Sequence, residues 1–188
     1  MTHAHGGAIT PAMRYSAARL LILLPLAACV PEEGAQTSPP AAWEALSERV
    51  PESLGAFRRG TPAGLAEGAT GREFPFATGN RAIAGYIQLR PATEDDAAAD
   101  LSRQVQDVTQ SGPPHRRLRE RARPAPAGAL HCAELEGSFG RTPVDGLACS
   151  AVIRGNLLRI RLTMQRRDTR LEQAREFARA MVENLNAP

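Results

Sequence analysis

The sequence lacks several residue types that would indicate a particular function. It contains no lysine, so all 23 basic residues are arginines, and its wealth of alanine, glycine and proline is typical of a GC-rich genome. A single arginine is therefore weak evidence of a special role. Aromatic residues make up only 4% of the chain and none lies within its most basic segment, which argues against a nucleic acid partner because bases need aromatic side chains to stack on.

Catalytic and cofactor motifs are also missing. The sequence has no G-x-S-x-G, H-E-x-x-H, G-x-G-x-x-G or Walker pattern, and no C-x-x-C or H-x-x-x-H spacing for a metal. Glu134 and Glu136 could share one strand face about 7 Å apart, a spacing compatible with glycosidase chemistry. On an exposed sheet such residues more often pair with arginines, here Arg159 or Arg161, so we expect no enzyme, no cofactor and no metal.

No apolar run is long enough to cross a membrane, since a helix needs about 20 apolar residues. The main run, residues 20–26, follows Arg14 and Arg19 and leads through small residues to Cys29. A positive segment, an apolar run and small residues, in this order, predict a secretory signal peptide over residues 1–28.

The end of this segment, Leu26-Ala27-Ala28-Cys29, resembles the lipobox of bacterial lipoproteins, even if Met13 is the true start. The resemblance implies that Cys29 receives a diacylglycerol and, after cleavage, an acyl chain such as palmitate, which together anchor the protein to the membrane. Val30 stands where proteins retained in the inner membrane have aspartate, so the resemblance implies the periplasmic side of the outer membrane. The alternative is an ordinary signal peptide that leaves Cys29 as a free thiol.

The segment after the lipobox separates the anchor from a folded domain. Residues 29–40 contain mainly proline, glutamate, glycine, serine and threonine, and they predict a disordered tether. A short helix over residues 41–49 could rest on the membrane through Trp43, but packing on the domain is the simpler expectation. Residues 41–188 are enough for one domain. Loss of residues 1–28 lowers the formal net charge from +3 to about +1, so the basic precursor says little about partners.

Hydrophobic periodicity predicts the elements of this domain. Alternation or apolar runs predict strands over residues 54–59, 72–76, 81–90, 130–136, 147–154 and 157–164. A period of 3.6 predicts one helix from Thr93 to Gly112 and another over residues 169–185, which a capping box of Thr169 and Glu172 opens. In the first of these two helices we expect the polar side chains to face water: Asp100, Arg103, Gln106 and Asp107.

Two cysteines beyond the signal segment predict a disulfide. Cys132 and Cys149 are an even pair in a compartment where disulfides persist. They would lie opposite one another if the strands over residues 130–136 and 147–154 paired as a hairpin through the connection 137–146. The bridge would close a loop of about 18 residues, worth roughly 3 kcal/mol in the chain-entropy model. A thiol nucleophile or a metal site with His131 has no supporting motif.

The most basic segment lies between the predicted helix and the hairpin. It contains five arginines: Arg116, Arg117, Arg119, Arg121 and Arg123. Such a segment could bind an anionic group, for example the phosphate of lipopolysaccharide, or an acidic partner. The alternative is a solvated loop or short helix whose charge Glu120 softens, and we expect such a loop or helix here.

The order of the predicted elements resembles the PsbP-like fold of thylakoid-lumen and bacterial envelope proteins. The resemblance implies an α+β domain with an antiparallel sheet of about five to six strands packed by two main helices, and an accessory or binding role. We therefore expect a non-catalytic module that binds an envelope protein partner. A small-ligand-binding lipoprotein, with an apolar pocket between sheet and helix, and an envelope glycan hydrolase using Glu134 and Glu136 remain as alternatives.

Overall fold

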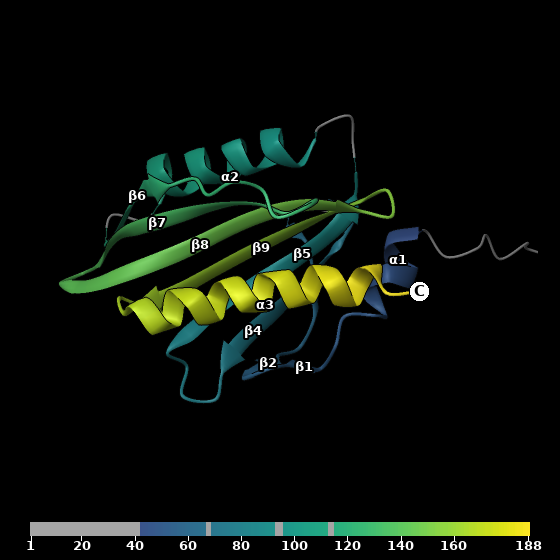
Figure 1. Cartoon of the computed structure of the whole chain (residues 1–188), viewed down its shortest axis with the longest axis horizontal. Helices are drawn as coiled ribbons and strands as arrows, with labels where there is room; N and C mark the ends of the chain where they lie inside the picture. The colour runs from purple at the N-terminus through teal and green to yellow at the C-terminus, as the bar shows by residue number, and fades with distance from the viewer. Residues whose placement is uncertain (1–41, 67–68, 93–95, 113–114) are drawn as a thin grey trace, which may run out of the picture. The chain divides into compact units, whose positions relative to one another are not determined.

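The computed structural model describes residues 42–66, 69–92, 96–112 and 115–188 (Figure 1). The predicted signal peptide, the tether, Cys29 and Thr93 lie outside the described residues. The elements follow one another in this order: α1 (Ala42–Ser47), β1 (Ser53–Leu54), β2 (Phe57–Arg59), β3 (Ala63–Gly64), β4 (Arg72–Thr78), β5 (Ile83–Pro91), α2 (Ala97–Gln110), β6 (Arg116–Ala122), β7 (His131–Phe139), β8 (Thr142–Ile153), β9 (Asn156–Gln165) and α3 (Asp168–Asn186).

Within the described residues, nine strands form a single sheet in which neighbouring strands run antiparallel. Their order is β1-β2-β4-β5-β9-β8-β7-β6, with β3 pairing to β4 beside this path. The α+β class and the antiparallel sheet are confirmed. The expected five to six strands were too few, because a turn at Gly55, whose φ is 58°, splits the predicted strand 54–59 in two. In addition, β3 is too short to show a period, and β6 was expected to be a loop or helix.

The two long helices cover opposite faces of this sheet. In β8, Leu147 and Cys149 belong to the large core cluster that packs under α3, whereas Ala148, between them, belongs to a smaller cluster under α2. Alternate residues of a strand point to opposite faces, so this split assigns one face to each helix. In Figure 1, α2 and α3 accordingly lie apart from each other, on either side of the ribbons of β8 and β9.

Helix α3 supplies the largest apolar face. Its predicted stripe is fully confirmed, because these side chains are all buried: Leu171, Ala174, Phe177, Ala178, Met181 and Leu185. The capping box was wrong. The helix begins at Asp168, so Thr169 lies within the first turn, and the cap residue Arg167 makes no side-chain hydrogen bond. The carboxylate of Asp168 is instead placed in the first turn, where it favours the positive end of the helix dipole.

Helix α1 packs on the domain, which confirms the simpler of the two expectations for this segment. Leu46 and Val50 are each 2% exposed and belong to the cluster under α3, while Trp43 is half-buried. The burial of both apolar side chains among strand and helix residues leaves this segment with a structural role in the domain.

The hairpin of β7 and β8 is longer than predicted. The expected connection over residues 137–146 is mostly strand, and the turn is confined to Gly140 and Arg141, with a φ of 58° at Gly140. Gly137 pairs with Val144, and Gly146 pairs with Leu135, without a break in register. Glycine is a turn signal in sequence, but here it occupies ladder positions, which is why the end of β7 was predicted too early and the start of β8 too late.

Helix α2 is held to the sheet by a buried carboxylate. Asp100, expected to face water, is 0% exposed. It accepts hydrogen bonds from Arg159 Nε at 2.8 and 3.0 Å, from Arg90 Nη2 at 2.9 Å and from Ser150 Oγ at 2.8 Å. Gln104, one turn further along α2, donates to Ser150 Oγ at 2.9 Å. The helix therefore docks through polar contacts to β5, β8 and β9 beside its apolar contacts to β6, β7 and β8.

These contacts also determine the ionisation of Asp100. Burial raises its pKa, but the hydrogen bonds from Arg159 and Ser150 and the charges of Arg159 and Arg90 outweigh burial and hold the pKa below its ordinary value. The carboxylate is therefore charged in the folded protein, and its negative charge compensates those of the surrounding guanidinium groups.

Replacing Asp100 by asparagine keeps the shape of the side chain but removes this compensating charge. We expect the free energy of unfolding at pH 7 to fall by about 3–5 kcal/mol, because a buried ion pair loses one partner. Urea unfolding measures this change. The exposed Asp107 on the same helix is the control, and Asp107→Asn should change the free energy of unfolding by less than about 0.5 kcal/mol.

The effect of Asp100 should depend on pH with a definite sign. A carboxyl group whose pKa is lower in the folded state stabilises the protein above its unfolded pKa of about 3.9, and the stabilisation is lost as the pH falls through the folded value. The difference in unfolding free energy between wild type and Asp100→Asn should therefore shrink on acidification below about pH 4. A difference that stays constant across this range would contradict the assignment.

Candidate functional site

The predicted arginine segment forms β6, a strand at the edge of the sheet. Of the described strands, only β7 pairs with β6, so the outer side of β6 is a free edge. The expected loop or short helix was wrong. Leu118 is the one buried residue of this strand, and a single buried position gives no alternation from which a strand can be recognised.

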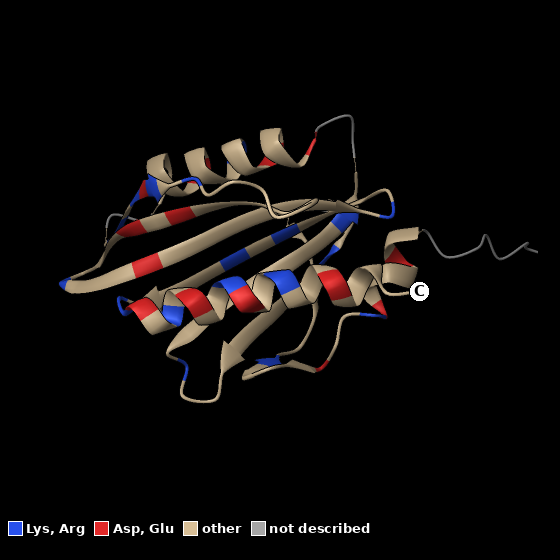
Figure 2. Cartoon of the chain, in the orientation of Figure 1, with Lys and Arg blue, Asp and Glu red and all other residues tan. Residues whose placement is uncertain are grey.

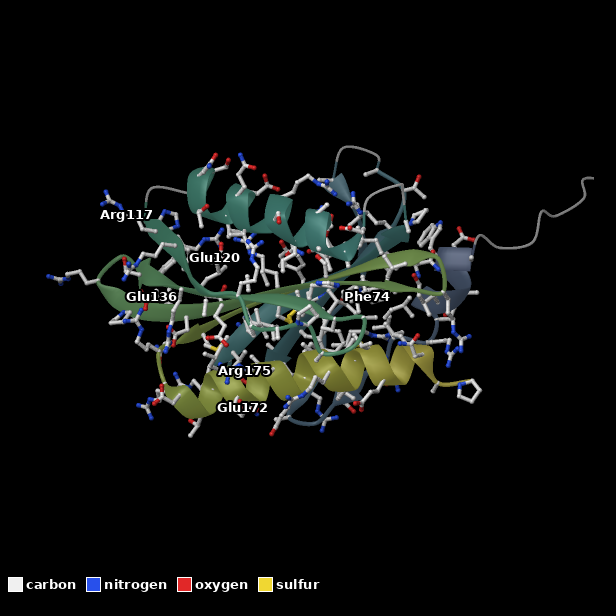
Figure 3. All side chains as sticks on the ribbon, turned by 45° about the horizontal axis from the view of Figure 1, so that its top comes forward. Phe74, Arg117, Glu120, Glu136, Glu172 and Arg175 are labelled. Carbon is white, nitrogen blue, oxygen red and sulfur yellow. A yellow bond between two sulfur atoms is a disulfide. The ribbon has the colours of Figure 1, made fainter. Side chains whose placement is uncertain are left out.

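The five arginines of this segment do not act as one cluster. Arg119 pairs with Glu136 on β7, and Arg123 pairs with Glu120 at 2.8 Å. Arg117 and Arg121 are exposed, and no ion pair joins either of them to an acid in the described part of the chain. Figure 3 shows the side chain of Arg117 pointing away from the ribbon. The free edge therefore carries positive charge that no acid of the described residues neutralises.

Arg116 lies on the other face of β6. It is two residues before Leu118, which packs in the cluster under α2, so both side chains point to the α2 face. Burial and the charge of Arg161 on β9 lower the pKa of Arg116, while Tyr86 on β5 acts in the opposite direction. Arg161 donates a long hydrogen bond of 3.4 Å to the hydroxyl oxygen of Tyr86. Arg116 and Arg161 thus share this face, and the charge of Arg161 acts on Arg116.

The carboxylates considered for catalysis are both held by arginines. Glu134 accepts from Arg175 Nε on α3 at 3.0 Å. Glu136 pairs with Arg119 and, at 3.7 Å, with Arg166. The expected partners Arg159 and Arg161 were wrong, because they point to the opposite face, where Arg159 binds Asp100. Since each carboxylate is engaged by guanidinium groups, the pair offers no support for hydrolase chemistry.

The contact of Glu134 continues along α3 as a chain of charges. Arg175 also binds Glu172 at 2.7 Å, and Glu172 binds Arg179 at 3.2 Å. The hydrogen bond to Glu134 is the main cause that raises the pKa of Arg175, and the hydrogen bond from Arg175 lowers the pKa of Glu172. Figure 2 shows both signs of charge along α3, and Figure 3 shows Arg175 and Glu172 together on this helix.

The two cysteines lie directly opposite each other in the β7–β8 ladder. Their sulfur atoms are 2.08 Å apart, at disulfide distance, and their Cα atoms are 4.1 Å apart. Cys149 is 0% exposed, and Cys132 packs against the cluster under α3. This arrangement leaves neither sulfur as a thiol nucleophile or a metal ligand.

The space between α3 and the sheet is filled by aromatic side chains. The ring of Phe177 lies 4.3 Å from that of Phe57 and 5.1 Å from that of Phe76, between centroids. A recess at the rim, lined by Leu54, Phe57 and Gln173 among others, holds about 170 Å³, less than the roughly 300–1,000 Å³ that ligand sites typically enclose. A larger recess of about 490 Å³ lies at the first turn of α3, and polar side chains such as Thr78, Asn80 and Arg170 contribute to its lining. The expected alternative of an apolar ligand pocket between sheet and helix therefore gains no support here.

No helix in the described parts of the chain is long and apolar enough to cross a membrane. Comparison with known proteins gives no further guidance: no family model matches the chain, and no curated protein is similar to it in sequence. The assignment of function rests on the residues and their geometry.

Replacing Arg175 by glutamine should reveal the dependence of the fold on a paired Glu134. Glu134 is 6% exposed, so loss of its arginine leaves a buried carboxylate with weaker compensation. We expect the free energy of unfolding to fall by about 2 kcal/mol, less than for a fully buried pair because Arg175 is 36% exposed and solvent screens its charge. Chemical denaturation measures this. Arg179→Gln, which affects only an exposed pair, should cost less than about 0.5 kcal/mol, and an equal loss in both variants would contradict the role of Glu134.

Proposed function

We propose that the protein is a non-catalytic binding or accessory module of the bacterial envelope, and that it binds an acidic protein partner along the free edge of β6. In this proposal a lipid on Cys29 anchors the protein to the periplasmic side of the outer membrane. The domain is PsbP-like in this proposal, a fold whose members are mostly accessory or binding proteins. The free, positively charged edge of β6 is the observation that carries the proposal.

A free sheet edge has a specific binding chemistry. Its backbone N–H and C=O groups on the outer side can pair with an extended segment of another protein, which adds a strand to the sheet. The side chains beside that edge then select the partner. Arg117 and Arg121 are exposed and Arg119 is 79% exposed, so a segment with acidic residues complements β6 in charge.

Charged residues on an edge strand also protect it from unwanted pairing. Charges of either sign, or a mixture of both signs, are enough to protect an edge strand from unwanted pairing. Along β6 the exposed charges are mainly arginines, and Glu120 is already bound by Arg123. A surplus of one sign at an otherwise open edge favours recognition of the opposite charge.

The lipobox supports the placement of this edge near a membrane. A tether over residues 29–40, if it behaves as a flexible chain, gives the domain a reach of about 20 Å from its lipid. The β6 edge would then meet partners that are themselves embedded in, or attached to, the same membrane.

The lipid anchor can be tested by metabolic labelling with a fatty acid. The wild-type protein should incorporate label, whereas Cys29→Ser should incorporate none and should leave the membrane fraction. Cys132 is no site for the lipid in this proposal, so Cys132→Ser should be labelled like the wild type. Equal labelling of Cys29→Ser and the wild type would refute the anchor.

Partner binding can be tested with charge reversals that break no internal ion pair. The double variant Arg117→Glu/Arg121→Glu should lose at least about tenfold in affinity for its partner, because both new charges repel an acidic segment. The measurement is capture of partner from envelope extract, followed by titration of the purified pair. The control is Arg58→Glu/Arg167→Glu, which reverses two exposed arginines outside β6.

Hydrogen exchange then distinguishes strand addition from other contacts. In the complex, the amides of β6 whose N–H groups face the free edge should exchange more slowly, while those of the β1–β2 hairpin should not change. Unchanged exchange in β6, or equal loss of binding in the control variant, would reject the edge as the binding site.

A further inference from the structure

Arg116 and Arg161, on the α2 face of the sheet, have no acidic partner among the described residues, whereas Arg159 on the same face has one. Arg159 and Arg161 alternate along β9 and therefore point to the same face. Arg159 is neutralised by Asp100. Arg161 is half-buried, and its one hydrogen bond within the described residues goes to the hydroxyl oxygen of Tyr86. The guanidinium groups of Arg159 and Arg161 thus share a face, but only that of Arg159 is paired with a carboxylate.

Arg116 brings a second positive charge to Arg161. It reaches the same face from β6, and the charged or polar groups that shift its pKa are Arg161 and Tyr86, with no carboxylate among them. Nε of Arg116 and Nη2 of Arg161 are buried, and neither has a hydrogen-bond partner in the described part of the chain. Buried nitrogens of this kind are normally satisfied, and two like charges that act on each other are destabilising.

A bound anion would accept hydrogen bonds from these nitrogens and would compensate the two positive charges. A guanidinium group presents a planar set of donors that matches the oxygens of a phosphate or carboxylate. Tyr86 adds a hydroxyl that accepts from Arg161 through its oxygen and keeps its hydrogen free to donate. Since two full positive charges face the site, a dianion compensates them better than a carboxylate with a single charge does.

We infer that Arg116, Arg161 and Tyr86 form a binding site for a phosphate-type oxyanion on the sheet face beside α2. The oxyanion is either a free phosphate or soluble phosphate monoester, or a lipid headgroup that ends in a phosphate monoester, and the chemistry of recognition is the same for both. This site goes beyond the proposed partner edge, because Arg117 and Arg121 make no part of it.

Binding can be measured by titrating the full-length protein in detergent with inorganic phosphate, at constant ionic strength, by calorimetry. Saturable binding is expected. Arg116→Gln and Arg161→Gln should each weaken it at least about tenfold, because each removes a charge-assisted hydrogen bond, and Tyr86→Phe should weaken it less. The control Arg58→Gln should bind phosphate like the wild type. Absence of saturable binding, or equal weakening by Arg58→Gln, would overturn the site.

The stability of the ligand-free variants gives a second test. If Arg116 and Arg161 repel each other in the absence of an anion, Arg161→Gln should unfold at the same temperature as the wild type or at a higher one. Phosphate should raise the unfolding temperature of the wild type and leave that of Arg161→Gln unchanged. A ligand-free Arg161→Gln that unfolds several degrees lower would show that the arginine serves the fold, and would overturn the inference.

Vesicles distinguish the two sources of the oxyanion. The protein is inserted by its own anchor into vesicles of phosphatidylcholine alone or mixed with phosphatidic acid, whose headgroup is a phosphate monoester. If lipid phosphate occupies the site, the apparent affinity for inorganic phosphate should fall in the mixed vesicles, and this competition should vanish in Arg161→Gln. If free phosphate is the ligand, the two vesicle types give the same affinity. Capture of the acidic partner by Arg161→Gln should stay normal, which separates this site from the β6 edge.

Discussion

A single buried carboxylate determines how α2 sits on the sheet. Asp100 contacts β5 through Arg90, β8 through Ser150 and β9 through Arg159, so one side chain of the helix is tied to three strands. Such a contact is directional, because the hydrogen bonds require the donors at definite positions, whereas apolar packing alone tolerates sliding. The apolar cluster under α2 is small, and the ion pairs therefore contribute position as well as energy.

The same chemistry explains which arginines are available for binding. A chain without lysine uses guanidinium groups for every ion pair, and in this domain the buried acids Asp100, Glu134 and Asp145 each have an arginine. Of the arginines that have no acidic partner among the described residues, Arg117 and Arg121 lie at the free edge of β6, and Arg116 and Arg161 lie on the face beside α2. Function is proposed at these two places because no carboxylate of the described residues compensates their charge.

Hydrophobic periodicity predicted the strands and the helix in which apolar side chains recur with a regular period. The strands β4, β5 and β9 and the stripe of α3 follow their periods closely, because each of these elements buries one regular face. Prediction was weaker where polar residues form contacts distant in sequence. Asp100 lies 59 positions from Arg159, and nothing local to Asp100 indicates that this acid turns inward. Arg116 was predicted as one of five possible anion contacts, but its position on the same face as Arg161 was missed for the same reason, since only the sheet order brings β6 and β9 onto a common face.

The charge of the β6 edge also has a consequence for encounters between copies of this protein. Two molecules that met edge to edge would align arginine against arginine, and like charges directly opposite each other destabilise a strand pair. The arginines would therefore keep these domains apart at high protein concentration, while the backbone groups of the same edge stayed open to a segment of opposite charge. The arginines of one exposed strand, β6, would then both prevent self-association of the domain and select an acidic binding partner.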